Sequence, residues 1–176
     1  MEIAEGTSTE LLQAMQNLEV DLCIISERKG AADWIPLAED ELLACLPLQH
    51  PRAGGRQKAG DTGTAARFPV TAFAEEDFIE LYPGKETDNS RMFQRCGVRP
   101  RMRYSTSDNY AAYAMVAAGL GITCTNAIIG EAFTEGVVYQ PLDPPQKVEI
   151  GLVLPAPKDM SPAARRFAEF AKDRFR

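Results

Sequence analysis

The sequence is short of the features that mark a membrane, secreted or nucleic-acid-binding protein. No run approaches the about 18 apolar residues of a membrane span, and Glu2 and Glu5 stand where a signal peptide would carry basic and then apolar residues. Lysine and arginine number 19 against 25 aspartates and glutamates, a formal net charge of −6, whereas phosphate binding needs clustered cations. We therefore expect a cytoplasmic chain that by itself contacts neither a membrane nor DNA.

Residues for metal binding or nucleophilic catalysis are also scarce. The four cysteines, at positions 23, 45, 96 and 124, form no CxxC pair, and three lie in apolar runs where a free thiol behaves as a small hydrophobic side chain. His50 is the single histidine and lies in the turn-rich loop QHPRAGG. One histidine cannot form a metal site without other ligands. A Ser-His-Asp triad would be possible only if His50 were its histidine. We expect reduced cysteines, no metal, no cofactor and no enzymatic activity.

The most informative segment runs from Tyr104 to Ile129, YSTSDNYAAYAMVAAGLGITCTNAII. Ser107 or Asp108 can cap a helix, Gly119 suits the left-handed residue that ends one, and Gly121 lets the chain enter a strand. The helix between them has hardly any polar face, which predicts that it is largely buried. A capped helix start favours a small anion, although the pattern also fits an ordinary helix–strand unit without a ligand.

Strand and helix patterns alternate along the rest of the chain. Strands are expected over residues 2–5, 20–26, 42–46 and 78–82. Thr7 and Glu10 match a capping box before a helix that reaches residue 18. Another helix is expected between cap candidates at 87–89 and Gly97. Such alternation favours parallel or mixed sheets that helices cover on both faces.

The last segment predicts an amphipathic helix that begins with the cap-then-proline pair Ser161 and Pro162. Its basic residues are expected in solvent. Four other side chains are expected to face the core: Phe167, Phe170, Ala171 and Phe175.

Two basic segments allow both a binding and a solvated interpretation. Residues 52–67 hold four glycines and four lysines or arginines with one acid, which is typical of a polar loop or a contact with an anionic ligand. Arg99, Arg101 and Arg103 alternate, which places them on one face of a strand. That face could bind an acidic ligand or partner, or it could be a solvated face that protects a sheet edge.

Six phrases occur in an order that resembles the effector-binding domain of LysR-type transcriptional regulators. They are LLQAMQNLEVDLCIIS, PLAEDELLACLPLQHPRA, DFIELYP, RCGVRPRMRY, MVAAGLGITCTNAII and VEIGLVLP, and together they extend over nearly the whole chain. The resemblance implies an α/β fold of two Rossmann-like lobes joined by two crossing strands, as in type 2 periplasmic binding proteins. Lobe one would comprise residues 1–42 and 151–176, and lobe two residues 43–150.

The resemblance also implies a site for a small, anionic or polar effector in the cleft between the lobes, outside the carboxyl ends of the strands. The loops at those strand ends supply the candidate residues. They are Gly6, Thr7, Ser8, Tyr82, Pro83, Gly84, Thr106, Ser107, Thr125 and Asn126. Each could instead serve only as a helix cap or turn residue.

The chain departs from the family pattern at its start. The family domain opens with a strand and helix that would precede Met1, and residues 2–5 match the second strand. We expect either a truncated chain or a rearrangement in which residues 2–5 pair with residues 20–26, because an unfilled position in a sheet leaves backbone groups unpaired. An exposed sheet edge also favours a homodimer, with helices 8–18 and 161–176 as contact faces.

We therefore expect the ligand-sensing domain of a LysR-type regulator, which reaches DNA only through a DNA-binding domain absent from this chain. A stand-alone solute-binding protein of the same fold is the alternative. An enzyme on that architecture, such as a dehydratase or deaminase, would need a convergent acid–base pair in the cleft.

Overall fold

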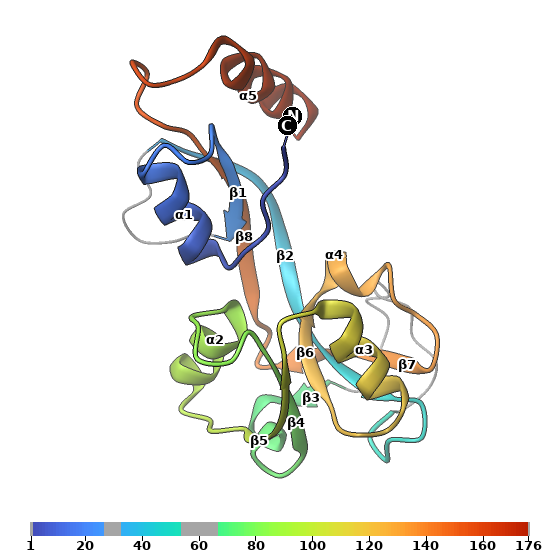
Figure 1. Cartoon of the computed structure of the whole chain (residues 1–176). Coiled ribbons are helices and arrows are strands. Elements are labelled where there is room, and N and C mark those ends of the chain that lie inside the picture. Colours follow the sequence, from blue (N-terminus) through green and yellow to red (C-terminus); the bar gives the residue numbers. More distant parts are fainter. Residues whose placement is uncertain (1, 27–32, 54–66, 176) are drawn as a thin grey trace. The chain divides into compact units, whose positions relative to one another are not determined.

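The computed structural model describes residues 2–26, 33–53 and 67–175 of the chain (Figure 1). It contains helices and strands in alternation, as the sequence predicts. The helices are α1 (Ser8–Gln16), η1 (Val70–Ala74, a 3₁₀ helix), α2 (Asp88–Cys96), α3 (Asn109–Ala117), α4 (Ala127–Gly130) and α5 (Pro162–Arg174). The strands are β1 (Cys23–Ser26), β2 (Trp34–Pro47), β3 (Phe68–Pro69), β4 (Asp77–Leu81), β5 (Arg101–Thr106), β6 (Thr123–Asn126), β7 (Val137–Asp143) and β8 (Lys147–Val153).

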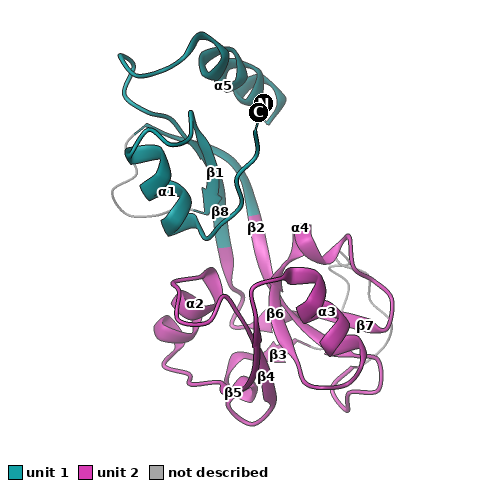
Figure 2. Ribbon diagram, in the orientation of Figure 1, with its two compact units in different colours: residues 1–39, 148–176 teal, residues 40–147 magenta. Residues whose placement is uncertain are grey.

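The chain forms two compact units (Figure 2). Unit 1 comprises residues 1–39 and 148–176, and unit 2 comprises residues 40–147. Two strands belong to both units, because β2 passes from unit 1 into unit 2 and β8 returns from unit 2 to unit 1. Unit 2 is therefore a continuous segment, whereas unit 1 is assembled from both ends of the chain.

Unit 1 is a small sheet with one helix on each face. Strand β8 lies between β1 and β2, and it pairs with β1 in an antiparallel register that sets Ile24 opposite Leu152. Helix α1 packs Met15 against Cys23, Ile25 and Val153 on one face. Helix α5 covers Leu152 and Leu154 on the other face.

The start of unit 1 corrects one expectation. Residues 2–6 form no strand, so they do not pair with β1, and the expected rearrangement does not occur. Ile3 is the only large apolar residue in this segment and is 76% exposed. A strand needs a side-chain face to bury and a partner edge, and this segment supplies no such face.

The capping box before α1 is confirmed. The Thr7 hydroxyl accepts a hydrogen bond from the backbone N–H of Glu10, and the Glu10 carboxylate accepts one from the backbone N–H of Thr7.

The buried face of α5 differs from the prediction. The Ser161 cap, the proline in the first turn and the burial of Ala171 are as expected, but the other buried residues are Ala164 and Ala168 instead of phenylalanines. Phe167, Phe170 and Phe175 are 40%, 64% and 55% exposed. Small alanines let the helix backbone lie close to Leu152 and Leu154, and this rotation turns the phenylalanines outward. The aromatic residues therefore form an apolar outer face of unit 1.

Unit 2 contains a mixed sheet, as the strand and helix pattern predicts. Strand β2 pairs antiparallel with β6 on one side and with β7 on the other, and β7 pairs parallel with β3. Strands β4 and β5 form a parallel pair beside β6, because Phe78 bridges Ile122 in a parallel sense. The predicted strand 42–46 is the C-terminal part of a much longer strand, β2.

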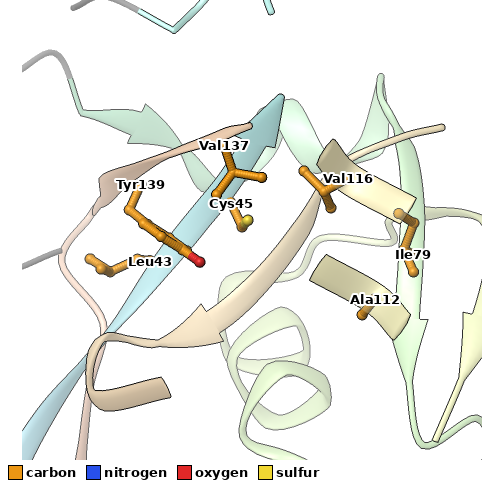
Figure 3. Packing of buried hydrophobic residues seen from close by; sticks show 7 residues of the cluster. All are labelled: Leu43, Cys45, Ile79, Ala112, Val116, Val137 and Tyr139. Carbon is orange, nitrogen blue, oxygen red and sulfur yellow. The ribbon is translucent and has the colours of Figure 1, made fainter. Parts of the chain in front are cut away.

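Two groups of apolar side chains form the core of unit 2. Leu43, Cys45 and Tyr139 from the antiparallel strands, together with Val137 and Ile79, meet Ala112 and Val116 of α3 (Figure 3). The second group is a cluster of phenylalanines, with Phe73 in contact with three others. The ring centroids of Phe68, Phe93 and Phe78 lie 4.8, 5.3 and 5.5 Å from that of Phe73.

Helix α3 is less buried than expected. Only Ala112 and Val116 are buried, while Tyr110 is 63% exposed. The helix is apolar on every side, but the sheet covers one side alone. Gly119 takes the expected left-handed conformation, with φ at +77°.

Three further expectations concern residues 52–104. Thr87 and Gly97 are the N-cap and C-cap of α2, as predicted. Strand β5 begins at Arg101, so Arg99 precedes the strand instead of lying on it, although all three arginines are exposed. Most of the basic segment 52–67 lies outside the described residues.

Candidate functional site

The parallel strands of unit 2 end at one edge of the sheet. The register of β4 and β5 sets Leu81 opposite Thr106, and the Tyr82 N–H donates to the Thr106 carbonyl over 2.9 Å. Strand β6 runs beside β4 in the same direction, as the parallel bridge between Phe78 and Ile122 shows, and the Thr123 hydroxyl donates to the Ile79 carbonyl over 2.8 Å. The carboxyl ends of β4, β5 and β6 therefore lie together.

A helix begins shortly after each of these strands: α2 after β4, α3 after β5 and α4 after β6. Helix starts carry backbone N–H groups that no residue of the same helix accepts, and they carry partial positive charge. The side chains of Thr87 and Asp108 cap α2 and α3. The Asn89 side-chain amide donates to the Cys124 carbonyl over 2.7 Å, which fixes the first turn of α2 against β6. The first turns of α2 and α3 are thus capped at this edge, and that of α2 is attached to β6.

Seven of the predicted site residues lie at this edge of unit 2. They are Tyr82, Pro83, Gly84, Thr106, Ser107, Thr125 and Asn126. Tyr82 has a positive φ of 54°. Asn126 occupies the N-cap position of α4, but its side chain makes no capping hydrogen bond there. The Thr106 hydroxyl accepts from the Asp108 N–H over 3.1 Å, so one of its lone pairs serves the local turn.

The other three predicted residues, Gly6, Thr7 and Ser8, lie in unit 1 before and at the start of α1. Their hydroxyl groups already have partners. Besides accepting from the Glu10 N–H, the Thr7 hydroxyl donates to the Glu10 carboxylate over 2.9 Å. The Ser8 hydroxyl accepts from the Ser26 N–H over 3.2 Å. Both hydroxyl groups therefore have hydrogen-bond partners within the protein and need no ligand to satisfy them.

Replacing Thr7 by alanine should therefore lower the free energy of unfolding by about 1 kcal/mol, the usual contribution of an N-cap side chain. Urea denaturation would measure the loss. Thr9→Ala is the matched control, because Thr9 is exposed and lies in the first turn after the cap. Equal stability of both variants would contradict the capping role.

The sequence did not indicate a further residue at the edge, Asp40. This aspartate is 5% exposed although it carries a carboxylate. Its Oδ1 accepts from the N–H of Glu41 over 2.9 Å and from the N–H of Ile128, at the start of α4, over 3.3 Å. The signal in the sequence is an acid two positions before the apolar run LLACL, but the contact with α4 joins residues 88 positions apart.

The cysteines are free, and burial suppresses the reactivity of three of them. Burial raises the pKa of the Cys23 thiol to about 11 and that of Cys45 to about 12, and it raises the pKa of Cys124 as well. Thiolate is the reactive form of cysteine, so these side chains act as core residues.

His50 is held in its loop by two contacts, since its Nδ1 accepts from the Arg52 N–H and its Nε2 lies 3.4 Å from a Glu76 carboxylate oxygen. Within residues 2–26, 33–53 and 67–175, no cluster of three His, Cys, Asp or Glu side chains could hold a metal ion. No helix in the same ranges is long and apolar enough to cross a membrane.

Comparison with known protein families identifies the family of this chain. The model of the LysR substrate binding domain matches residues 1–176, the whole chain. The chain belongs to this family. The curated relatives that match this chain are transcriptional regulators.

Relatives and solved structures agree with that assignment. The HTH-type transcriptional regulator YvbU of Bacillus subtilis is 24% identical over 97% of the chain, and the transcriptional dual regulator GltC of the same organism is 24% identical over 96%. The chain spans 56% and 55% of these two proteins. The regulatory domain of Synechocystis CcmR, solved with 2-PG, has a TM-score of 0.77 at 24% identity, with 97% of this chain and 80% of that domain covered.

A second solved structure, the effector binding domain of QuiR in complex with shikimate, has a TM-score of 0.76 at 19% identity. The match covers 97% of this chain and 78% of that domain. These likenesses establish the LysR effector-domain fold, with its likeness to periplasmic binding proteins.

Proposed function

We propose that this LysR domain senses a small polar or anionic metabolite, and that the ligand binds at the edge of unit 2 formed by the ends of β4, β5 and β6. The observation that carries the proposal is the convergence of three strand ends and three helix starts at that edge. Backbone N–H groups at helix starts favour carboxylates and phosphates, and ligands of open α/β sheets bind outside the carboxyl ends of strands.

Two structural neighbours support this ligand class. CcmR was solved with 2-PG and QuiR with shikimate, and both are regulatory domains of the same fold. In this chain, Ser107 and Asn126 are the polar side chains best placed for a ligand. Ser107 is exposed after β5, and the Asn126 amide makes no capping bond to α4.

Calorimetric titration with 2-PG, shikimate and a panel of small carboxylates would test the proposal. We expect at least one compound to bind, and we expect Asn126→Ala to weaken it about tenfold, the effect of losing one hydrogen bond to a charged ligand. Asn17→Ala is the control, because Asn17 is an exposed residue of unit 1. A panel without a binder, or binding that neither Asn126→Ala nor Ser107→Ala alters, would refute the site.

We further propose that the domain forms a homodimer through unit 1. Within the described residues, β1 is the outermost strand of its sheet, and unpaired strand edges favour pairing with another chain. Ile24 is 48% exposed on the face of the sheet that α5 covers, and the outward phenylalanines of α5 add further exposed apolar surface to unit 1. Basic residues of α5 and acidic residues in and before α1 give two copies complementary charges, and two-fold symmetry is the common arrangement.

Sedimentation at low micromolar concentration should therefore detect a dimer. Phe170→Glu should convert it to a monomer, because a charge would have to be buried in an apolar contact. Leu120→Glu provides the control, since Leu120 is 44% exposed but lies in unit 2. A monomeric wild-type protein, or equal dissociation of both variants, would exclude this interface.

A further inference from the structure

Asp40 carries a carboxylate oxygen that the fold does not use. The residue is 5% exposed, and its Oδ2 has less than 1 Å² of accessible area. Among the residues that the structure describes, Oδ2 has no hydrogen-bond partner, whereas Oδ1 has two. Buried carboxylates are normally paired or fully hydrogen-bonded. This one therefore requires an explanation beyond the packing of unit 2.

Asp40 belongs to the candidate site by its position. Strand β2 runs antiparallel to β6 with Leu42 opposite Asn126, which places Asp40 just past the carboxyl end of β6. The hydrogen bond from the Ile128 N–H holds the carboxylate against the first turn of α4. Both partners lie in unit 2, so the geometry does not depend on unit 1.

The two backbone hydrogen bonds account for the presence of one acceptor oxygen at position 40, but not for a carboxylate. Binding the Ile128 N–H requires a single acceptor, and a neutral serine or asparagine would supply it equally well. A carboxylate keeps a second oxygen and a full negative charge. Oδ2 can only accept, so its missing partner is an N–H or O–H group, and a buried negative charge is best satisfied by a cationic donor.

We propose that Asp40 Oδ2 accepts a hydrogen bond from a protonated amine of the effector, so that the ligand class is an amine-bearing small acid such as an amino acid. This inference rests on the proposed function, because it adds a cation-binding contact to the same edge of unit 2. Since Oδ2 is enclosed, the amine must displace neighbouring atoms to reach it.

Matched pairs of ligands separate the amine from the rest of the molecule. L-Alanine and L-lactate, L-aspartate and L-malate, and L-phenylalanine and L-3-phenyllactate differ only in an ammonium or a hydroxyl group. Calorimetry should show at least one amino acid binding tenfold or more tightly than its hydroxy partner. In Asp40→Asn, which preserves shape and the acceptor for Ile128, this preference should fall below twofold. Glu41→Gln, with the same change one residue away, should keep it.

The outcomes distinguish this inference from the proposed function. If hydroxy acids, shikimate or 2-PG bind as well as or better than the amines, the amine contact is wrong while the sensing role stands. A preference that survives in Asp40→Asn also overturns it. If no compound binds, both proposals fail. Should Asp40→Asn not fold, the carboxyl ¹³C resonance of Asp40 in the wild-type domain decides: it must shift with the amino acid and stay fixed with its hydroxy partner.

Discussion

Replacing Gly121 by alanine should destabilise unit 2 by about 3 kcal/mol, the upper part of the usual range for a side chain forced into a packed site. A Cβ atom at this position would lie closer than 3.0 Å to the backbone carbonyl oxygen of Asp77. That oxygen accepts from the Ile122 N–H, and the neighbouring Ile79 N–H donates to the Ile122 carbonyl. The alanine would therefore push apart the contact that places β4 beside β6, and the chain cannot relieve the clash by rotating a side chain.

Thermal unfolding would measure this effect, with an expected fall in the melting temperature of roughly 6–12 °C. Gly119→Ala is the matched control. Gly119 has φ +77°, and a Cβ atom added there would meet no other part of the fold within 4 Å. It should cost only the strain of a left-handed alanine, about 1 kcal/mol. A Gly121→Ala domain as stable as Gly119→Ala would mean that β4 and β6 are not held this closely.

Phe73→Ala should cost 3–5 kcal/mol by urea denaturation, about what removal of a fully buried phenylalanine costs. The Phe73 side chain is completely buried, and three phenylalanine rings surround it, those of Phe68, Phe78 and Phe93. Two of the three contacts are edge-on, an arrangement that adds to the energy of simple burial. The truncation would leave a cavity that rigid neighbouring rings cannot fill.

Phe73→Leu should lose well under half as much, because leucine retains most of the apolar volume. Phe133→Ala is a second comparison, since Phe133 is only half-buried and stacks on Tyr113 at 5.1 Å. Equal losses for Phe73→Ala and Phe133→Ala would contradict the central place of Phe73 in the core.

The sequence predicts those parts of the fold that depend on neighbours along the chain. The caps Thr7, Thr87 and Ser161 and the helix-ending Gly97 and Gly119 are where the pattern places them, because each acts on backbone groups within four residues. The order of family phrases indicated the LysR fold, which the family match confirms.

Predictions failed where the burial or the contacts of a residue depend on an element that is distant in the sequence. An apolar helix does not reveal which side a sheet will cover, so the burial of α3 was overestimated. In α5 the phenylalanines were wrongly expected in the core, which alanines occupy. Residues 2–5 form no strand, because Ile3 is their only large apolar side chain and no apolar face is available to bury. Asp40 was missed for the same reason, because its role depends on Ile128, 88 residues away. The predicted site residues themselves remain a proposal.

The position of β8 between β1 and β2 sets the order in which the protein can fold during synthesis. Unit 2 is contiguous and ends at residue 147, so all of its residues leave the ribosome before β8 is complete. The sheet of unit 1 cannot form before its central strand β8 has been made, and one face of that strand stays uncovered until α5, which follows β8 in the chain, has been made. A nascent chain stalled after residue 147 has left the ribosome, but before β8 and α5 have done so, should therefore hold a folded unit 2 while β1 and α1 remain sensitive to protease, since domains fold as units during translation.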